Sequence, residues 1–323
     1  MSIRPPGLPL LSVLVLLGGG PARSEGAPPP VMAFKFAWPV PSHVSITERI
    51  DSGREHASLK YDGVLTARKP GPGSELRFEN LQQLDSDSPR SPPGVASTED
   101  PKARLTTFTK PGLVLSGTGA LTDLAGLEPA FERAVTVLET DPRARETQRA
   151  RWDNPLFQTV LRDRAELTWT AWVGTWNGVR LAPGQEQTKT TALRHPNGPL
   201  EQRSTLRHQG AVAETPGAVR LEWETSLGGA SYRQVVARTR ELRCSAALAR
   251  NASDPCAAEV LESASSVTTV ELITEPNTLR PFSVRIVDTE AFTVKGQPPV
   301  IQRAERTYAF DWTRKAKQRP PTR

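Results

Sequence analysis

A tryptophan-rich stretch, residues 166–178, constrains the fold more than any other part of the chain. It reads ELTWTAWVGTWNG and holds three of the seven tryptophans, Trp169, Trp172 and Trp176. Alternate residues of the stretch fall on opposite sides of a period-two pattern, and threonine and tryptophan favour a pleated, packed surface. We therefore predict a strand over residues 166–176, closed by an Asn-Gly turn. Trp169 then faces one side of the sheet, and Trp172 and Trp176 face the other.

Two interpretations of these indole side chains remain open. In the first, all three tryptophans fill the core between a sheet and the helices that cover it. In the second, Trp172 and Trp176 lie opposite Trp169 and line a cleft or patch for an apolar ligand or partner. The candidate ligand-binding residues are therefore Trp169, Trp172 and Trp176.

The composition is typical of a sheet protein with many turns. The chain has 30 prolines and 23 glycines among 323 residues, and 37% of its residues are apolar. Short alternating segments predict antiparallel hairpins before the tryptophan-rich stretch, at residues 34–38, 44–50, 57–61, 76–84 and 105–115. The same pattern returns after it, at residues 187–193, 202–208, 219–225, 267–274, 282–294 and 303–312.

Between these two groups of strands the hydrophobic period changes to that of a helix. We predict three helices with apolar stripes, over residues 127–138, 142–151 and 155–164. A capping box that begins at Ser231 predicts a further helix over residues 232–248. A strand is the alternative for this segment, because Val235, Val236 and Thr239 are β-branched. Asp254-Pro255 predicts one more short helix, which ends at Ser263.

The last strands carry a likeness to a known family. The turn Glu275-Pro-Asn-Thr-Leu-Arg-Pro281 and the strand Arg306-Thr-Tyr-Ala-Phe310 resemble the closing section of the half-barrel of the bacterial lipoprotein-carrier family. The resemblance concerns the order of elements over most of the chain, which is longer than that pattern, and it carries over no functional residue. It implies an α+β fold in which a large curved antiparallel sheet holds helices 127–164 on its concave face. A two-sheet sandwich with helical inserts is the alternative.

The N-terminal residues 1–24 have the features of a secretory signal peptide. A charged start precedes the apolar run Leu8–Leu17 and the small-residue exit Ala22-Arg-Ser24. The apolar run is too short for a membrane span, which needs roughly 20 residues. We predict cleavage here, and an exported protein, periplasmic or extracellular, without a transmembrane segment. Because export implies an oxidising compartment, Cys244 and Cys256, the only two cysteines, are predicted to form a disulfide.

Residues 25–312 are predicted to form a single domain that contains a mobile, Asp/Ser/Pro-rich loop over residues 85–102. Residues 313–323 form a basic tail that we expect to be disordered. Of the net charge of +6, residues 1–24 carry two positive charges and the tail carries five, which leaves the body near −1. This balance argues against a nucleic-acid partner, because such a partner needs a basic face on the folded body.

The sequence lacks the signatures of several enzyme classes. It contains no G-x-S-x-G, H-E-x-x-H, P-loop or dinucleotide fingerprint, and its four histidines are scattered. We therefore expect no catalytic residue, no metal and no cofactor. The feature that remains as a basis for function is apolar surface, which binds apolar ligands or partners.

Three functions follow from these observations. The first is a non-catalytic protein that binds or carries a lipid-like or apolar ligand of the cell envelope, and it predicts an enclosed apolar cavity of several hundred Å³. The second is a structural or protein-interaction module without a small ligand. It predicts a contiguous exposed apolar patch that includes Trp172 and Trp176. The third, an unrecognised hydrolase, needs titratable groups that converge in a cleft.

Overall fold

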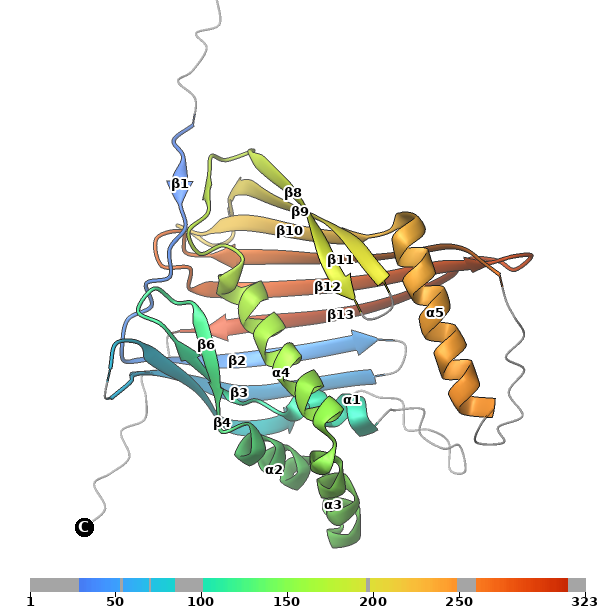
Figure 1. Ribbon diagram of the computed structural model, residues 1–323. Helices are drawn as coiled ribbons and strands as arrows, with labels where there is room; N and C mark the ends of the chain where they lie inside the picture. Colours follow the sequence, from blue (N-terminus) through green and yellow to red (C-terminus); the bar gives the residue numbers. More distant parts are fainter. Residues whose placement is uncertain are drawn as a thin grey trace, which may run out of the picture.

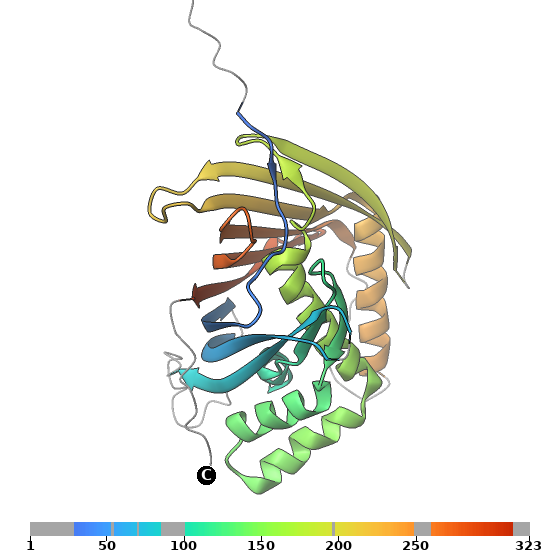
Figure 2. The ribbon, with the colours of Figure 1, turned by 90° about the vertical axis from the view of Figure 1, so that its left-hand side faces the viewer.

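The computed structural model describes residues 29–52, 55–69, 71–84, 101–195, 198–248 and 260–312. These residues form an open antiparallel sheet of 11 strands with helices on one side, so the predicted α+β fold with a large antiparallel sheet is confirmed (Figure 1). The sheet is curved when it is seen from its side (Figure 2). In sheet order its strands are β6 (Leu121–Ala125), β5 (Gly112–Leu115), β4 (Ser74–Leu84), β3 (Glu55–Ala67), β2 (Ser42–Ser52), β13 (Val300–Asp311), β12 (Pro281–Val294), β11 (Leu261–Thr274), β10 (Val219–Leu227), β9 (Gly198–Ala211) and β8 (Glu186–His195).

The helices are grouped in the middle of the chain, with one more near its end. They are α1 (Pro101–Phe108), α2 (Leu127–Leu138), α3 (Pro142–Arg149), the 3-10 turn η1 (Ala150–Asp153), α4 (Pro155–Trp169), the π-helical turn η2 (Thr170–Gly174) and α5 (Gly229–Leu248). Helix α4 crosses the concave face of the sheet, and η2 contacts β11 and β12 (Figures 1 and 2). A small ribbon of β1 (Met32–Ala33) and β7 (Arg180–Leu181) lies beyond the end of η2.

The predicted strand over residues 166–176 is wrong, because these residues continue α4 and form η2. Ala171 and Val173 are buried here as well, and the three buried tryptophans, Trp169, Trp172 and Trp176, are spaced by three and four residues. This spacing places all three tryptophans on the same side of a helix, toward the sheet. The period-two pattern therefore arose by coincidence, and the three tryptophans do not face opposite sides of a strand.

Local chemistry explains where this long helix begins and ends. Pro155 occupies its first turn, and the side chain of Asn154 accepts a hydrogen bond from the Leu156 N–H at 3.0 Å. The last turn widens, so that the Thr175 N–H donates to the Thr170 carbonyl at 3.0 Å. Such π turns inside a helix are frequent at functional sites.

The other predicted elements have mixed outcomes. The helices over 127–138, 142–151 and 232–248 are confirmed, whereas residues 105–108 belong to α1 and not to a strand. The predicted short helix that ends at Ser263 is wrong in its last residues, because β11 begins at Leu261. Residues 1–28, 85–100, 249–259 and 313–323 lie outside the described residues, so the signal peptide, the loop over 85–100 and the tail stay predictions. The loop was predicted to end at residue 102, which is wrong, because α1 begins at Pro101.

The main hydrophobic core fills the space between the concave face and helices α1, α2 and α4, and a small second cluster lies between α5 and β11. Trp172 lies near the centre of the main core, and its ring meets the rings of Tyr308 and Phe310 edge-on at centroid distances of 5.2 and 5.0 Å. A buried indole removes on the order of 200 Å² from water, which corresponds to roughly 5 kcal/mol of transfer free energy. The tryptophan-bearing segment therefore holds α4 and η2 against the sheet.

Candidate functional site

A cleft of about 600 Å³ opens between the edge strand β6 and the helical segment of α4 and η2. Its volume lies within the roughly 300–1,000 Å³ that is typical of ligand pockets. We call it the β6–α4 cleft. The residues that define its chemistry are Leu121, Leu124, Arg162, Glu166, Trp169 and Asn177.

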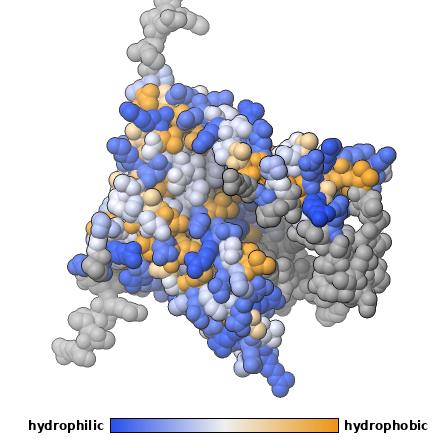
Figure 3. All heavy atoms as spheres, in the orientation of Figure 1, coloured by the Kyte–Doolittle hydropathy of each residue, from blue (hydrophilic) through white to orange (hydrophobic). Residues whose placement is uncertain are grey.

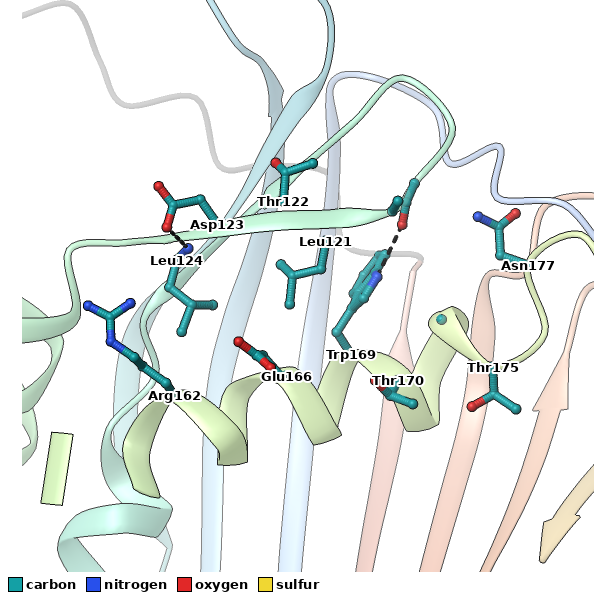
Figure 4. A pocket seen from close by; sticks show the side chains of 13 residues that line it. Leu121, Thr122, Asp123, Leu124, Arg162, Glu166, Trp169, Thr170, Thr175 and Asn177 are labelled. Atoms are coloured by element: carbon teal, nitrogen blue, oxygen red, sulfur yellow. Dashed lines mark hydrogen bonds between the residues drawn. The ribbon is translucent and has the colours of Figure 1, made fainter. Parts of the chain in front are cut away.

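Helix α4 supplies one wall of the cleft. Arg162, Glu166 and Trp169 are separated by four and three residues, so they share one face of the helix. Figure 4 shows Arg162 and Glu166 pointing from the helix toward β6, with Trp169 one turn further along. Both charged side chains are exposed, and neither forms an ion pair within 4.0 Å with any residue that the structure describes.

Strand β6 supplies the opposite, apolar wall. Leu121 and Leu124 point toward α4, whereas Thr122 and Asp123 point away from it (Figure 4). Both leucines are half-buried. The Asp123 carboxylate accepts a hydrogen bond from the Leu124 N–H at 2.8 Å, so this N–H of the edge strand is already satisfied. The cleft thus sets apolar side chains opposite charged ones.

Hydrogen bonds fix the inner end of the cleft. The Trp169 indole N–H donates to the Gly119 carbonyl at 3.1 Å. The Asn177 side chain donates to the Thr118 carbonyl at 2.6 Å and accepts from the Phe36 N–H at 3.1 Å. Three segments that are distant in the sequence are therefore tied together here, and this end of the cleft is preformed.

Of the three predicted ligand-binding tryptophans, the structure places Trp169 at the cleft. Its side chain is 2% exposed, so it offers an edge to the cleft and not a platform. Trp172 and Trp176 are 0% exposed, so the predicted exposed patch that includes them is wrong. The void beside Trp172 is only about 20 Å³, which is room for about one water molecule. The core interpretation accounts for the burial of both residues.

Five residues of the cleft lining were not predicted from the sequence: Leu121, Leu124, Arg162, Glu166 and Asn177. One signal was present, because a helix that continued through the tryptophan-rich stretch would have aligned the two charged residues with Trp169. No comparable signal identified β6, since its position against α4 depends on contacts between segments about 40 residues apart in the chain.

A second polar feature lies buried beneath α4. Glu48 on β2 is 0% exposed, and its Oε2 accepts a hydrogen bond from the Tyr61 hydroxyl at 3.0 Å. Lys110 Nζ lies 2.7 Å from the same oxygen, and Arg306 Nε lies 3.6 Å from Oε1. Burial, together with the charge of Glu48, raises the pKa of Tyr61 well above its ordinary value, so its hydroxyl stays protonated and donates. We call these residues and Tyr308, the cross-strand partner of Glu48, the Glu48 cluster.

The Glu48 cluster brings titratable groups together in the core and not in a cleft. The void beside it that Tyr61, Lys110 and Trp172 line has a volume of about 20 Å³, which is too small for a substrate. Within the described ranges, no group of three or more histidine, cysteine, aspartate or glutamate side chains is placed to hold a metal ion. The geometry therefore directs attention to the β6–α4 cleft.

No protein-family model matches the chain, and the search of curated proteins finds no match. The fold and the cleft alone define the class: an α+β chain with an open, curved antiparallel sheet and a ligand-sized cleft at its β6 edge. Among the helices that the structure describes, none is both long and apolar enough to cross a membrane. Cys256 lies outside the described residues, as does the side chain of Cys244, so their disulfide stays a prediction.

Proposed function

We propose that this chain is an exported, non-catalytic binding protein of the cell envelope, and that an amphipathic, lipid-like ligand occupies the β6–α4 cleft. One observation carries the proposal. A cleft of about 600 Å³ sets Leu121 and Leu124 on one wall opposite Arg162 and Glu166 on the other. A ligand with an apolar part and a charged part matches these two walls, because each part meets side chains of its own kind.

The site differs from the enclosed apolar cavity that the sequence suggested. The space beneath α4 is filled by aromatic side chains, while the ligand-sized volume lies beside the helix and is open to solvent. A carrier that holds its ligand in such a cleft shields only part of it. We therefore expect an amphiphile with one short apolar chain in contact with the protein, and not a fully enclosed lipid.

Strand addition by an extended peptide is a less suitable use of the same edge. Strand β6 has five residues, and its Leu124 N–H is already bonded to Asp123. Short strands and satisfied edge groups are features with which proteins prevent further strands from pairing. The cleft therefore favours a small amphiphile over a peptide that extends the sheet.

Native mass spectrometry of the protein purified from its own host tests the proposal. We expect an adduct of lipid-like mass that disappears after organic extraction. Leu124→Gln should weaken rebinding of the extracted ligand at least about tenfold, because the apolar wall is lost. The control Leu156→Gln changes the same side chain on the exposed face of α4, where Leu156 is 75% exposed, and should leave binding unchanged. Extracted and unextracted protein of identical mass would overturn the proposal.

An interaction module remains the second candidate, and one observation favours it. Leu156, Val160 and Leu167 lie on one face of α4 and are 75%, 40% and 38% exposed. On the face drawn in Figure 3, however, the apolar side chains of the described residues are interspersed with hydrophilic ones. A co-purifying protein without a lipid adduct in the same mass spectra would support this candidate over the first.

A further inference from the structure

Two opposite charges project into the β6–α4 cleft from successive turns of α4. Arg162 and Glu166 are four residues apart, which is about 6 Å along a helix axis. An arginine and a glutamate at this spacing are able to pair with each other. In this structure they do not, since no ion pair within 4.0 Å joins either side chain to a described residue. Both point toward β6 instead (Figure 4).

The rest of the cleft lining carries one further charge, that of Asp123. The third charged residue of its lining, Asp123, points away from α4, and its carboxylate is engaged by the Leu124 N–H. The polar wall thus offers one guanidinium and one carboxylate. A purely anionic ligand would be attracted by Arg162 and repelled by Glu166, and a purely cationic ligand would meet the reverse.

We propose that the ligand of the cleft carries a zwitterionic head group, with its anionic part on Arg162 and its ammonium part on Glu166. This inference rests on the proposed function, because it assigns the polar end of the same amphiphile. The guanidinium forms paired, charge-assisted hydrogen bonds with a phosphate or carboxylate, and the glutamate accepts hydrogen bonds from an ammonium. The apolar part then extends along Leu121 and Leu124.

Binding of three single-chain lipids that differ only in their head group tests the inference. The probes are a lyso-phosphatidylethanolamine (zwitterionic), a lyso-phosphatidylglycerol (anionic) and a monoacylglycerol (neutral), each measured below its micellar concentration by native mass spectrometry. We expect the zwitterionic probe to bind at least about tenfold more tightly than the other two. Equal affinity for all three overturns the zwitterionic head group but leaves the proposed function standing. Binding of none of them overturns both.

Variants of Arg162 and Glu166 test whether these two side chains cause the preference for the zwitterionic probe. Arg162→Gln should remove the preference over the neutral probe and Glu166→Gln the preference over the anionic probe, each by at least about fivefold. The controls Arg143→Gln and Glu146→Gln make the same charge changes on exposed positions of α3, outside the cleft, and should have no effect. Equal effects of the cleft variants and the α3 variants would overturn the inference.

The same zwitterionic chemistry occurs in free phosphoethanolamine, so one further measurement separates the two sources. If the apolar wall contributes, the free head group should bind at least about tenfold more weakly than the lyso-lipid. Leu124→Gln should then weaken lyso-lipid binding without changing that of free phosphoethanolamine. Equal affinities for the two would support a small zwitterion as the ligand and overturn the lipid source.

Discussion

Replacing Glu48 by glutamine removes one charge from the core without changing the shape of the side chain. Glu48 is the carboxylate that Lys110 and Arg306 both approach, and it also accepts the hydrogen bond of Tyr61. Lys110 and Arg306 have side chains that are only 12% and 14% exposed, so water screens these charges weakly. Glutamine presents one carbonyl oxygen to these donors and adds an amide donor of its own.

The expected loss follows from burial. Removing one partner of a buried ion pair destabilises a protein by about 3–5 kcal/mol. Glu305 on β13 provides a matched control, because it bonds Arg285 through two hydrogen bonds of 2.7 and 2.9 Å on the exposed side of the sheet. A surface pair of this kind contributes only about 0–1 kcal/mol. We therefore expect Glu48→Gln to lower the free energy of unfolding at least about threefold more than Glu305→Gln does.

Urea unfolding followed by tryptophan fluorescence measures both variants, since four indoles are packed in the core. A loss below about 1 kcal/mol for Glu48→Gln, or equal losses for the two variants, would refute the assignment of the Glu48 cluster as a stabilising network. If Glu48→Gln does not fold, Tyr61→Phe provides a milder test. It removes one hydrogen bond and should lower the free energy of unfolding by about 1 kcal/mol.

Three further changes test other parts of the structure. Trp172→Ala should lower the free energy of unfolding by about 3–5 kcal/mol in urea titrations, whereas a loss below about 1 kcal/mol would contradict its central place in the core. Gly119→Ala should lower the free energy of unfolding by about 2 kcal/mol or more, because Gly119 has a φ of +81° and an added Cβ would overlap the Phe36 ring. Gly117→Ala is the control and should have little effect, because the space around Gly117 is open. Burial lowers the pKa of His208 below its ordinary value, so below about pH 6.5 the unfolded chain takes up a proton that the folded chain resists, and stability falls as the pH falls. His208→Phe should remove that part of the pH dependence in thermal unfolding. If the melting temperature of the variant falls at acidic pH as much as that of the wild type, other groups cause the fall.

Secondary structure could be predicted from the sequence where the hydrophobic pattern of a segment fitted either the helical period or the strand period, and not both. Helix α2 is an example: its buried residues recur at intervals of three and four and do not all fall on one face of a strand, namely Leu127, Ala130, Phe131, Ala134 and Val135. The late strands β11, β12 and β13 were also anticipated, because β-branched residues and turn signals bound them. Local physical chemistry determines these elements, so one sequence sufficed to predict them.

The prediction for the tryptophan-rich segment was wrong because its residues fit the strand period and the helical period at once. Trp169 and Val173 share a side both in a strand and in a helix, and threonine and tryptophan raise the strand propensity. The decisive information lay upstream. The Asn154 cap begins a helix with Phe157 and Leu161 on the core face, and no glycine or proline interrupts it before Gly174. Segment length and a cap should therefore outweigh alternation when both periods fit.

The cleft could not be predicted from the sequence, because it depends on pairing between distant segments. Strand β6 is five residues long and pairs with β5 through a register shift after Val114. Which of its faces meets α4 is set by that register, and a shift of one residue would exchange Leu124 for Asp123 on the wall of the cleft. Neither the register nor the approach of α4 is encoded in a local pattern.

The position of Trp169 connects the core to the proposed site. Its ring packs against Phe36 and Trp38 in the core, while its N–H holds the turn at Gly119 at the end of the cleft. The same helix therefore presents a core face and, next to it, the face that carries Glu166. Because tryptophan packing fixes the helix, a ligand meets a wall that is ordered before it binds. Little of its binding free energy is then lost in ordering the backbone, so affinity should depend mainly on the contacts of the ligand with the two walls.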